Sequence, residues 1–354
     1  MAKIKVLHVI TEKHLGSASR QLLVLCNNSS AVFELQALIP EGSELKPLLK
    51  ALNVPCFSYE ASHNSSQVAL KAIMREIKKI SPDIVHTHST FNGRIPIRPS
   101  AKFKRVHTQH TIEKSGFFAR LANKSSNIRT IATSEAARKA LLKMGIADAK
   151  IQVIYDGVKP SEDYSDECDK LRTEFGIPQD AFVATCITEL TKDCAYLLDT
   201  AKELPYNVVM LIGSTGGANE YKALMQARAE HENLYNVRIL PDIENLDNVL
   251  AVTDVQINLS QAPEIVSHPI LYGMSADKPT ISPNFNKYVI ENDMNGLLIA
   301  SNDPESLDDA IIKLKDDKDL YERLSKGAKR RYNERFTAAR MIAKLEKIYQ
   351  ELGV

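Results

Sequence analysis

Two successive series of short β-branched runs, most of them followed by a longer segment of helical period, constrain the fold of this chain more than any other feature. The first series comprises Ile4–Ile10, Phe33–Leu38, Cys56–Tyr59, Asp83–His86, Arg105–Thr108, Thr130–Ala132 and Ile151–Tyr155. The second comprises Ala181–Ile187, Val208–Ile212, Val237–Leu240, Val255–Leu259, Pro279–Ser282 and Gly296–Ile299. Such alternation is typical of βα units, which form parallel sheets with helices on both faces. The sequence therefore predicts an α/β protein with two Rossmann-like, doubly wound domains facing a cleft.

Segments of helical period define the predicted helices and the domain boundaries. In the first series they are Ser17–Cys26, Ser43–Leu52, Val68–Ile80 and Glu135–Met144. A polar, acidic stretch with a proline, residues 159–169, separates the two series and predicts a linker between a first domain, 1–158, and a second, 170–336. Apolar residues form one stripe along Thr337–Leu352. We therefore expect a final helix, about 337–354, that packs back on the first domain.

Composition excludes several classes of protein. The chain has 354 residues, of which 44% are hydrophobic and 25% charged, so it has enough apolar surface for two cores and is not disordered. Its five cysteines are odd in number and lack CxxC spacing, which disfavours a disulfide framework and a zinc site. No window approaches 18 consecutive apolar residues, and the first residues do not resemble a signal peptide. The expected location is the cytoplasm.

Charge is distributed unevenly along the chain. Residues 1–158 carry 23 Lys and Arg against 11 Asp and Glu, whereas residues 159–354 carry 22 against 33. A basic lobe attracts anionic partners, and its densest stretch, 94–129, mixes cations with apolar residues as a membrane-interface segment does. A solvated basic face is the alternative, and nucleic acid is disfavoured because the acidic lobe would repel a long polyanion. The predicted contacts with an acceptor or an anionic surface are His88, Arg94, Arg98, Lys102, Lys104 and Arg105.

Turns after the predicted strands carry the candidate binding residues. Gly16 and Ser17 lead directly into a helix, where a phosphate or sugar could approach the free amides. Gly213 lies in a similar turn of the second domain. A helix that starts near Ser267 or His268 would offer its amides to a diphosphate-sized anion. Neither GxGxxG nor a P-loop lysine motif occurs, so a dinucleotide dehydrogenase and a P-loop NTPase lose their main support.

Histidines gather after two strands of the first domain, at His86, His88, His107 and His110. Metal binding is one interpretation, although no nearby Cys or carboxylate completes a tetrahedral ligand set. Hydrogen bonding to sugar hydroxyls or phosphate, or proton transfer near neutral pH, is a second. Packing beside the strand ends is the third interpretation, for His86 and His107 in particular.

Taken in order, these motifs resemble the retaining family 4 glycosyltransferases, which have the two-Rossmann GT-B fold. The motifs that carry the resemblance are Gly16, Asp83–His88, Thr108–His110, Ala132–Glu135, Ile154–Val158, Gly213 and Asn295–Ile299. The resemblance covers essentially the whole chain. It implies a nucleotide-diphosphate sugar as donor in the second domain and an acceptor in the first, with no metal or other cofactor.

The resemblance also implies roles for individual residues. His110 and Glu264 would be the catalytic residues, Glu264 as the first glutamate of an E-x7-E motif. The implied contacts with the nucleotide sugar are Gly16, Ser17, Lys192, Gly213, Ser267, His268 and Tyr272. Tyr272 stands where the family has the second glutamate, and Glu189 stands where an arginine grips the diphosphate. A carboxylate within about 4 Å of a diphosphate costs roughly 1–4 kcal/mol.

Two hypotheses of function follow. The first is a metal-independent, retaining glycosyltransferase that moves a sugar to a lipid-linked, polysaccharide or other cell-envelope acceptor, in the cytoplasm or at the inner membrane face. The second is a catalytically weakened relative that binds or stabilises a glycosyltransferase partner protein, because Glu189 and Tyr272 replace expected donor contacts. A nucleotide-sugar epimerase or a phosphorylase on the same fold remains a third, weaker alternative.

Overall fold

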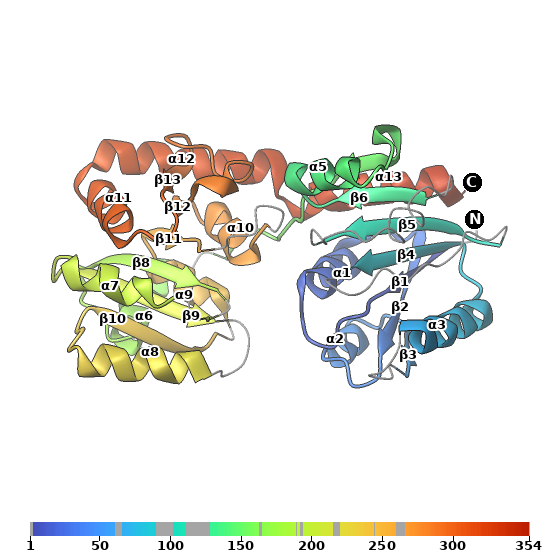
Figure 1. Ribbon diagram of the computed structural model, residues 1–354, viewed down its shortest axis with the longest axis horizontal. Helices are drawn as coiled ribbons and strands as arrows, with labels where there is room; N and C mark the ends of the chain where they lie inside the picture. The colour runs from blue at the N-terminus through green and yellow to red at the C-terminus, as the bar shows by residue number, and fades with distance from the viewer. Residues whose placement is uncertain are drawn as a thin grey trace. The chain divides into compact units, whose positions relative to one another are not determined.

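A computed structural model describes residues 3–60, 66–89, 102–110, 128–162, 165–188, 190–191, 194–214, 220–243, 245–259 and 266–353. The chain divides into two compact units, shown as separate groups of elements in Figure 1. Unit 1 comprises Met1–Gly157 and Thr337–Val354, and unit 2 comprises Val158–Phe336. Each unit contains one parallel sheet with helices packed against it, as the sequence predicts.

Unit 1 contains a seven-stranded parallel sheet with the order β3-β2-β1-β4-β5-β6-β7. Its strands are β1 (Ile4–Val9), β2 (Phe33–Pro40), β3 (Cys56–Tyr59), β4 (Ile84–Ser89), β5 (Lys104–Gln109), β6 (Ile128–Ala132) and β7 (Ile151–Val153). Its α-helices in the described ranges are α1 (Ser17–Asn28), α2 (Leu45–Ala51), α3 (Ser66–Ile80), α5 (Glu135–Lys143) and α13 (Ala338–Gly353). Strand order reverses between β1 and β4, which makes their carboxyl ends the topological switch point of the sheet.

Alternate side chains of β1 build two cores, one on each face of this sheet. Val6 packs with Leu345 of α13 on one face, whereas Leu7 packs with Ile73 of α3 on the other. This follows from the two-residue side-chain period of a strand. The apolar stripe of α13 is buried throughout, so the final helix completes the core of unit 1 although it comes from the far end of the sequence.

Unit 2 contains a six-stranded parallel sheet with the order β10-β9-β8-β11-β12-β13, reversing between β8 and β11. Its strands are β8 (Phe182–Ile187), β9 (Val208–Ser214), β10 (Val237–Asp242), β11 (Val255–Ile257), β12 (Thr280–Pro283) and β13 (Gly296–Ile299). Its α-helices in the described ranges are α6 (Cys168–Glu174), α7 (Tyr196–Glu203), α8 (Glu220–His231), α9 (Leu246–Val252), α10 (His268–Ser275), α11 (Pro304–Asp316) and α12 (Lys318–Arg335).

The predicted linker, 159–169, is attached to unit 2 along its described residues. Ser161 donates its hydroxyl to Asp247 at 2.6 Å, and its amide donates to the Ser275 hydroxyl at 2.8 Å. Cys168 already begins α6 and contacts the carbonyl of Ala251. A polar, acidic composition predicts exposure, but these long-range hydrogen bonds form only when α9 and α10 are in place.

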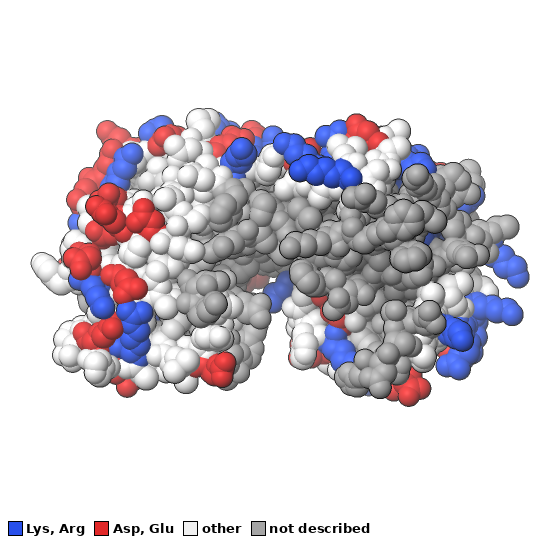
Figure 2. All heavy atoms as spheres, viewed as in Figure 1, with Lys and Arg blue, Asp and Glu red and all other residues white. Residues whose placement is uncertain are grey.

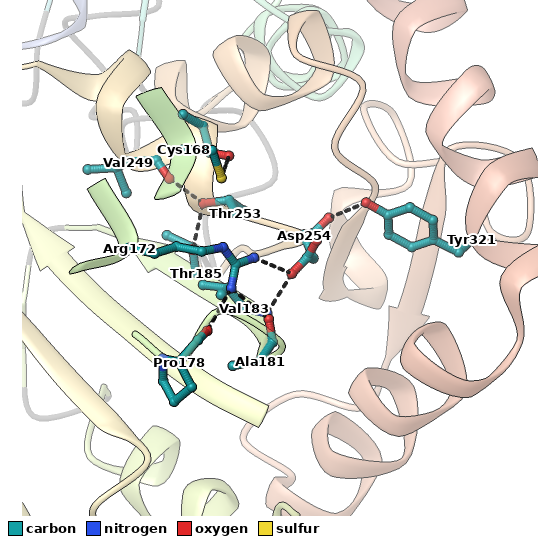
Figure 3. A network of polar contacts seen from close by, with 11 residues as sticks. Cys168, Arg172, Pro178, Ala181, Val183, Thr185, Val249, Thr253, Asp254 and Tyr321 are labelled. Carbon is teal, nitrogen blue, oxygen red and sulfur yellow. Dashed lines mark hydrogen bonds and ion pairs between the residues drawn. The ribbon is translucent and has the colours of Figure 1, made fainter. Parts of the chain in front are cut away.

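A polar network at the amino ends of β8 and β11 fixes α6 to the sheet (Figure 3). Asp254 accepts a hydrogen bond from the Val183 amide at 2.7 Å and lies 3.7 Å from the Arg172 guanidinium. Arg172 also donates to the carbonyl of Ala181 at 2.9 Å, and Tyr321 of α12 donates to the Asp254 carbonyl. Burial raises the pKa of the Asp254 carboxyl, partly offset by the Val183 amide. This edge is opposite the carboxyl ends, so its role is structural.

Candidate functional site

Unit 1 brings histidines together at its topological switch point. His8 on β1 is the register partner of His86 on β4, and His88 lies two residues further along the same strand. His110 follows directly after β5, the neighbouring strand. Ligands of doubly wound sheets bind outside the carboxyl ends of strands at such a point. The sequence-predicted His88 and His110 therefore lie together with His8, which the sequence analysis did not single out.

His8, His86, His88 and His110 form a buried histidine cluster. The Nδ1 atom of His8 lies 3.0 Å from Nε2 of His88, and Nδ1 of His88 lies 3.1 Å from Nε2 of His110. His86 stacks on His88 with ring centroids 4.2 Å apart, and its Nδ1 lies 2.6 Å from the hydroxyl of Tyr349. None of the four histidines is more than 2% exposed. The cluster thus links β1, β4, β5 and α13.

Burial keeps the imidazoles of His8, His86 and His88 neutral. It lowers the pKa of His8 from an ordinary value of 6.5 to about 3. The pKa values of His86 and His88 also lie well below the ordinary value, first because of burial and second because of the neighbouring histidines. A neutral imidazole has one N–H and one bare nitrogen, so each ring-to-ring hydrogen bond couples the tautomer of one histidine to that of the next.

The hydrogen bonds of the cluster can run in two directions. Nε2 of His8 stands at one end of the chain of rings and Nδ1 of His110 at the other. If His8 carries its proton on Nδ1, it donates to His88, and His88 donates from Nδ1 to Nε2 of His110. With the protons on the opposite nitrogens, both hydrogen bonds reverse. The geometry therefore couples the tautomers of the three rings in either direction.

Three members of the cluster are also the candidate metal ligands of the described residues. The ligand atoms of His8, His86 and His88 lie within 4.8 Å of one another. Hydrogen bonds already occupy five of their six ring nitrogens, including the 2.7 Å contact from His86 Nε2 to the hydroxyl of Thr108. The rings of His86 and His88 stack, whereas metal ligands converge on one centre. This arrangement fits a packed hydrogen-bonded cluster better than a metal site.

A carboxylate of the chain itself occupies the turn that contains Gly16. Glu12 accepts hydrogen bonds from the amide of Ser19 at 3.1 Å and from its hydroxyl at 3.3 Å, so it caps the first turn of α1. A Cβ atom on Gly16 would meet the Glu12 carboxylate, so a side chain at this position would require Glu12 to move. Burial raises the pKa of the Glu12 carboxyl, and the Ser19 hydrogen bonds oppose that rise. A phosphate bound to these amides would have to displace Glu12.

In unit 2, Gly213 has a packing role at the carboxyl end of β9. A Cβ atom at this position would lie 2.6 Å from Cδ1 of Ile243, so a side chain would push against the segment that follows β10. The Gly213 carbonyl accepts the amide of Thr188, directly after β8, at 3.1 Å. Gly213 therefore holds the chain segments after β8, β9 and β10 close together.

The start of α10 lies where the sequence predicts it. Ser267 is the N-cap residue and His268 the first helical residue, and the Ser267 side chain makes no capping hydrogen bond. Gln256 of β11 donates to the carbonyl of Pro269 at 2.9 Å, which fixes the first turn to the strand beside the switch point. His268 is buried, and Tyr272 lies one turn further along the helix, partly exposed. This helix start is the candidate anion-binding element of unit 2.

Several predicted site residues lie outside the described residues, namely Arg94, Arg98, Glu189, Lys192 and Glu264. Lys102 and Lys104 are exposed, as a surface contact requires. His88 and Arg105 are 2% and 9% exposed, which disfavours contact with an anionic surface, whereas contact with an acceptor stays a prediction. Both side chains belong to central strands, β4 and β5, where packing on the sheet faces covers them. Neither residue presents a charge to an anionic surface.

Sequence reasoning missed His8, Glu12 and Tyr349. The signal for His8 is a polar residue inside the otherwise apolar part of the first strand. Glu12 lies four residues before Gly16, so its carboxylate is within reach of the following helix start. Tyr349 belongs to the apolar stripe of the final helix, and nothing in the sequence indicates that its hydroxyl meets His86.

Comparison with known protein families accounts for both units. The family model described as Glycosyltransferase Family 4 matches residues 21–162, and the model described as Glycosyl transferases group 1 matches residues 169–331. A UDP-Gal:α-D-GlcNAc-diphosphoundecaprenol α-1,3-galactosyltransferase of Escherichia coli is 26% identical, with 100% of this chain and 98% of the relative covered. An O-antigen biosynthesis glycosyltransferase, WclY of Escherichia coli, is 25% identical over 58% of this chain and 57% of its own length.

Solved structures share the fold over the full length. A glycosyltransferase from Rickettsia africae superposes with a TM-score of 0.81 at 20% identity, covering 99% of both chains. HepE of Anabaena, solved with UDP and glucose, superposes with a TM-score of 0.80 at 18% identity over 98% of this chain and 100% of its own.

Two Rossmann-like units and two matching glycosyltransferase models define a glycosyltransferase of the GT-B fold. Within that class the chain belongs to the family 4-like enzymes. The fold and family that the sequence predicts are confirmed. None of the helices in the described ranges is long and apolar enough to cross a membrane.

Proposed function

We propose that this protein transfers a hexose from a UDP-sugar to a saccharide linked by diphosphate to a polyprenyl lipid, during assembly of a cell-envelope polysaccharide. The observation that carries the proposal is the full-length match to an enzyme named for this chemistry, the Escherichia coli galactosyltransferase. The similarity to HepE, solved with UDP and glucose, supports a UDP-sugar as the donor.

Unit 2 contributes the proposed donor site. The amides at the start of α10, which the Ser267 side chain does not cap, meet the diphosphate, because the amino end of a helix carries partial positive charge. Ser267, His268 and Tyr272 surround this element, and Lys192 supplies a cation that compensates for the acid at Glu189. With these amides and Lys192 in place, the diphosphate needs no metal ion. The turn after Gly213 contacts the nucleoside.

Unit 1 contributes the proposed acceptor site and His110. The histidine cluster orients His110, which forms a hydrogen bond with a sugar hydroxyl. The amides of Gly16 and Ser17 contribute to diphosphate binding once the Glu12 carboxylate has moved. The bond from sugar carbon C1 to the diphosphate breaks, a bond from C1 to the acceptor oxygen forms, and the acceptor hydroxyl proton passes to the departing diphosphate oxygen. Glu264 faces the donor sugar, and the configuration at C1 is retained.

The membrane is the proposed place of action, because a polyprenyl-linked acceptor resides there. In this proposal the protein associates with the inner membrane face from the cytoplasmic side. The basic charge of unit 1, 26 Lys and Arg against 13 Asp and Glu, supports an anionic contact surface.

A second candidate function is a weakened relative that binds a glycosyltransferase partner. The residues that favour it are Glu189 and Tyr272, which stand where donor-binding residues are expected. In that case the protein would neither turn over a UDP-sugar nor bind UDP, yet would form a stable complex with its partner.

The decisive experiment is donor turnover with UDP-hexoses and a detergent-solubilised, diphospholipid-linked N-acetylhexosamine acceptor. We expect UDP release that depends on the acceptor, and a reduction of at least about tenfold in both His110→Ala and Glu264→Ala, since positioned polar groups contribute this much or more. His231→Ala, at an exposed position of α8, is the matched control and should keep full turnover. Absence of both turnover and UDP binding would favour the partner-binding function.

A further inference from the structure

A cavity of about 620 Å³ opens in unit 1 beside the carboxyl-terminal half of α3. It lies between that helix and the segments that enter β4 and β5, at Ser81 and Lys102. This volume is within the range of about 300–1,000 Å³ that is typical of small-molecule sites. We call it the α3 pocket.

The floor of the α3 pocket is apolar. Met74, Ile77 and Phe103 line it, and all three belong to the core between α3 and the sheet. Ile77 and Phe103 are almost fully buried, whereas Met74 is only partly covered. An unbranched methionine adapts its shape readily, so the floor suits a flexible aliphatic chain.

The rim of the same pocket is cationic. Lys71, Arg75, Lys78 and Lys102 line it, and none of the described lining residues is acidic. Lys71, Arg75 and Lys78 share one face of α3 because they are spaced by four and three residues. Lys and Arg side chains gather over α3 in Figure 2.

Two cations of this rim, Lys71 and Lys78, have no acidic partner among the described residues. The ammonium groups of Lys71 and Lys78 make no hydrogen bond or ion pair with any residue that the structure describes, and the hydrogen bond of Ser81 to Lys78 goes to the backbone carbonyl. Oε1 of Glu76, on the same helix, lies 3.2 Å from Nε of Arg75 and 2.9 Å from Nζ of Lys79. This one carboxylate is therefore shared between two cations. Cations in the last turn complement the helix dipole, which explains Lys78 but not Lys71 or Arg75.

The α3 pocket is separate from the candidate catalytic residues. Its lining residues Pro82 and Phe103 immediately precede β4 and β5, whereas His88 and His110 lie at the carboxyl ends of these strands. A strand rises about 3.3 Å per residue, so the six residues of β4 put roughly 20 Å between the two edges.

From this geometry we infer that the α3 pocket binds one anionic phospholipid of the membrane. The acyl chain lies over Met74, Ile77 and Phe103, and the headgroup phosphate pairs with Lys71 and Lys78. This goes beyond the proposed sugar transfer, which needs no lipid at this edge. It also adds α3 to the predicted membrane contact, segment 94–129, whose Lys102 and Phe103 line the same pocket.

The phosphate bound here is not that of the proposed acceptor. In that acceptor the diphosphate is bonded directly to the sugar that receives the hexose, so it must lie within one sugar of the reacting atoms. The amino-end edge of the sheet is a whole strand length away from the candidate catalytic residues. A separate lipid molecule is therefore required.

The absence of tryptophan from the chain permits a direct test. Met74→Trp introduces a single fluorophore into the pocket floor, and Leu48→Trp, at an exposed position of α2, is the matched control. Vesicles of phosphatidylglycerol with brominated acyl chains should quench the fluorescence of Met74→Trp at least about twofold more than that of Leu48→Trp. Equal quenching of the two variants, or none, would overturn the proposal.

Competition distinguishes the sources of the phosphate. Unbrominated phosphatidylglycerol should restore the Met74→Trp fluorescence, whereas inorganic phosphate should not. Vesicles of brominated phosphatidylcholine alone should cause little quenching of Met74→Trp. Release of the quenching by a polyprenyl diphosphate instead, or equal quenching by the zwitterionic lipid, would contradict the assignment to an anionic membrane lipid.

A second test uses only exposed positions, so that folding is preserved. Lys71→Glu/Lys78→Glu should lower partitioning onto phosphatidylglycerol vesicles at least about tenfold, since basic residues near an anionic surface dominate such binding. Lys46→Glu/Lys50→Glu on α2 makes the same charge change elsewhere in unit 1 and should have a much smaller effect. Equal losses in both variants would indicate a general charge effect and overturn a specific site. Neither readout requires sugar transfer, so the proposal can fail independently of the proposed function.

Discussion

At the scale of single residues, Glu12 competes with the ligand expected at α1. Its carboxylate accepts the Ser19 amide at 3.1 Å and fills the space beside Gly16. A diphosphate at the same amides would meet this negative charge, which costs about 1–4 kcal/mol at 4 Å depending on exposure. The chain therefore carries an internal anion at the position where a phosphate is proposed to bind.

Glu12→Gln should tighten UDP binding at least about fivefold, because the amide oxygen still accepts from Ser19 while the charge is removed. Isothermal titration at pH 8 measures this with the wild-type carboxyl ionised. Glu41→Gln, at an exposed position nearby in sequence, removes the same charge and should leave the affinity unchanged. An unchanged affinity for Glu12→Gln would place the diphosphate away from α1.

The histidine cluster makes stability depend on pH in a defined direction. The pKa of His8 is about 3 in the folded protein, below its ordinary value of 6.5. Between pH 6.5 and pH 3 the unfolded chain therefore binds more protons at His8 than the folded protein does. The contribution of His8 is complete above about pH 6.5 and is lost as the pH falls toward the folded pKa. Lowering the pH from 7 to 5 should cost about 2 kcal/mol through His8 alone.

His8→Leu should reduce the stability difference between pH 7 and pH 5 by that amount, as measured by urea unfolding at both pH values. Leu7→Ala, a buried neighbour on β1 without a titratable group, should lower stability equally at both pH values. If His8→Leu had the same pH dependence as the wild type, His8 would not be buried as a neutral ring.

At the scale of elements, α13 connects the end of the chain to the first sheet. Leu345 is fully buried against Val6, Leu25 and Ile84, and Tyr349 bonds to His86. The helix therefore supports both the core of unit 1 and the histidine cluster.

Leu345→Ala should destabilise the protein by about 2–5 kcal/mol, the usual cost of deleting a buried leucine side chain. Lys344→Ala, the adjacent exposed position of the same helix, should change stability by less than about 0.5 kcal/mol. Urea unfolding monitored by circular dichroism compares the two. Similar small effects would mean that α13 contributes little to the core of unit 1.

At the scale of the whole molecule, the two units carry opposite charges. Unit 1 has 26 Lys and Arg against 13 Asp and Glu, whereas unit 2 has 19 against 31. The acidic unit is the one proposed to bind an anionic donor, so attraction at long range does not explain binding there. Local groups must do so, which is why the amides of α10 are central to the proposal.

Hydrogen exchange should show whether the amides of α10 contact the donor. Saturating UDP is expected to slow exchange most strongly at the first amides of α10, those of His268, Ile270 and Leu271, because bound ligand stabilises the structure it contacts. Peptides from α3 in unit 1 should be unaffected and serve as the internal control. Protection confined to unit 1 would contradict a donor site in unit 2.

The sequence by itself determined the class of fold and most element positions. The predicted strand Gly296–Ile299 has the observed bounds, and the helix predicted to start near Ser267 or His268 starts at His268. Runs of β-branched residues and apolar periodicity are local properties, so they are readable without tertiary structure. The family resemblance likewise rested on short local motifs, and the family models confirmed it.

Only the tertiary structure decided what surrounds the functional candidates. His8 meets His88 across 80 residues of sequence, and Tyr349 meets His86 across 263. Burial of Arg105 depends on the strands beside β5, and the α3 pocket depends on how α3 lies against the ends of two strands. These features arise from contacts between distant segments, and local sequence carries no information about which distant side chain fills a given space.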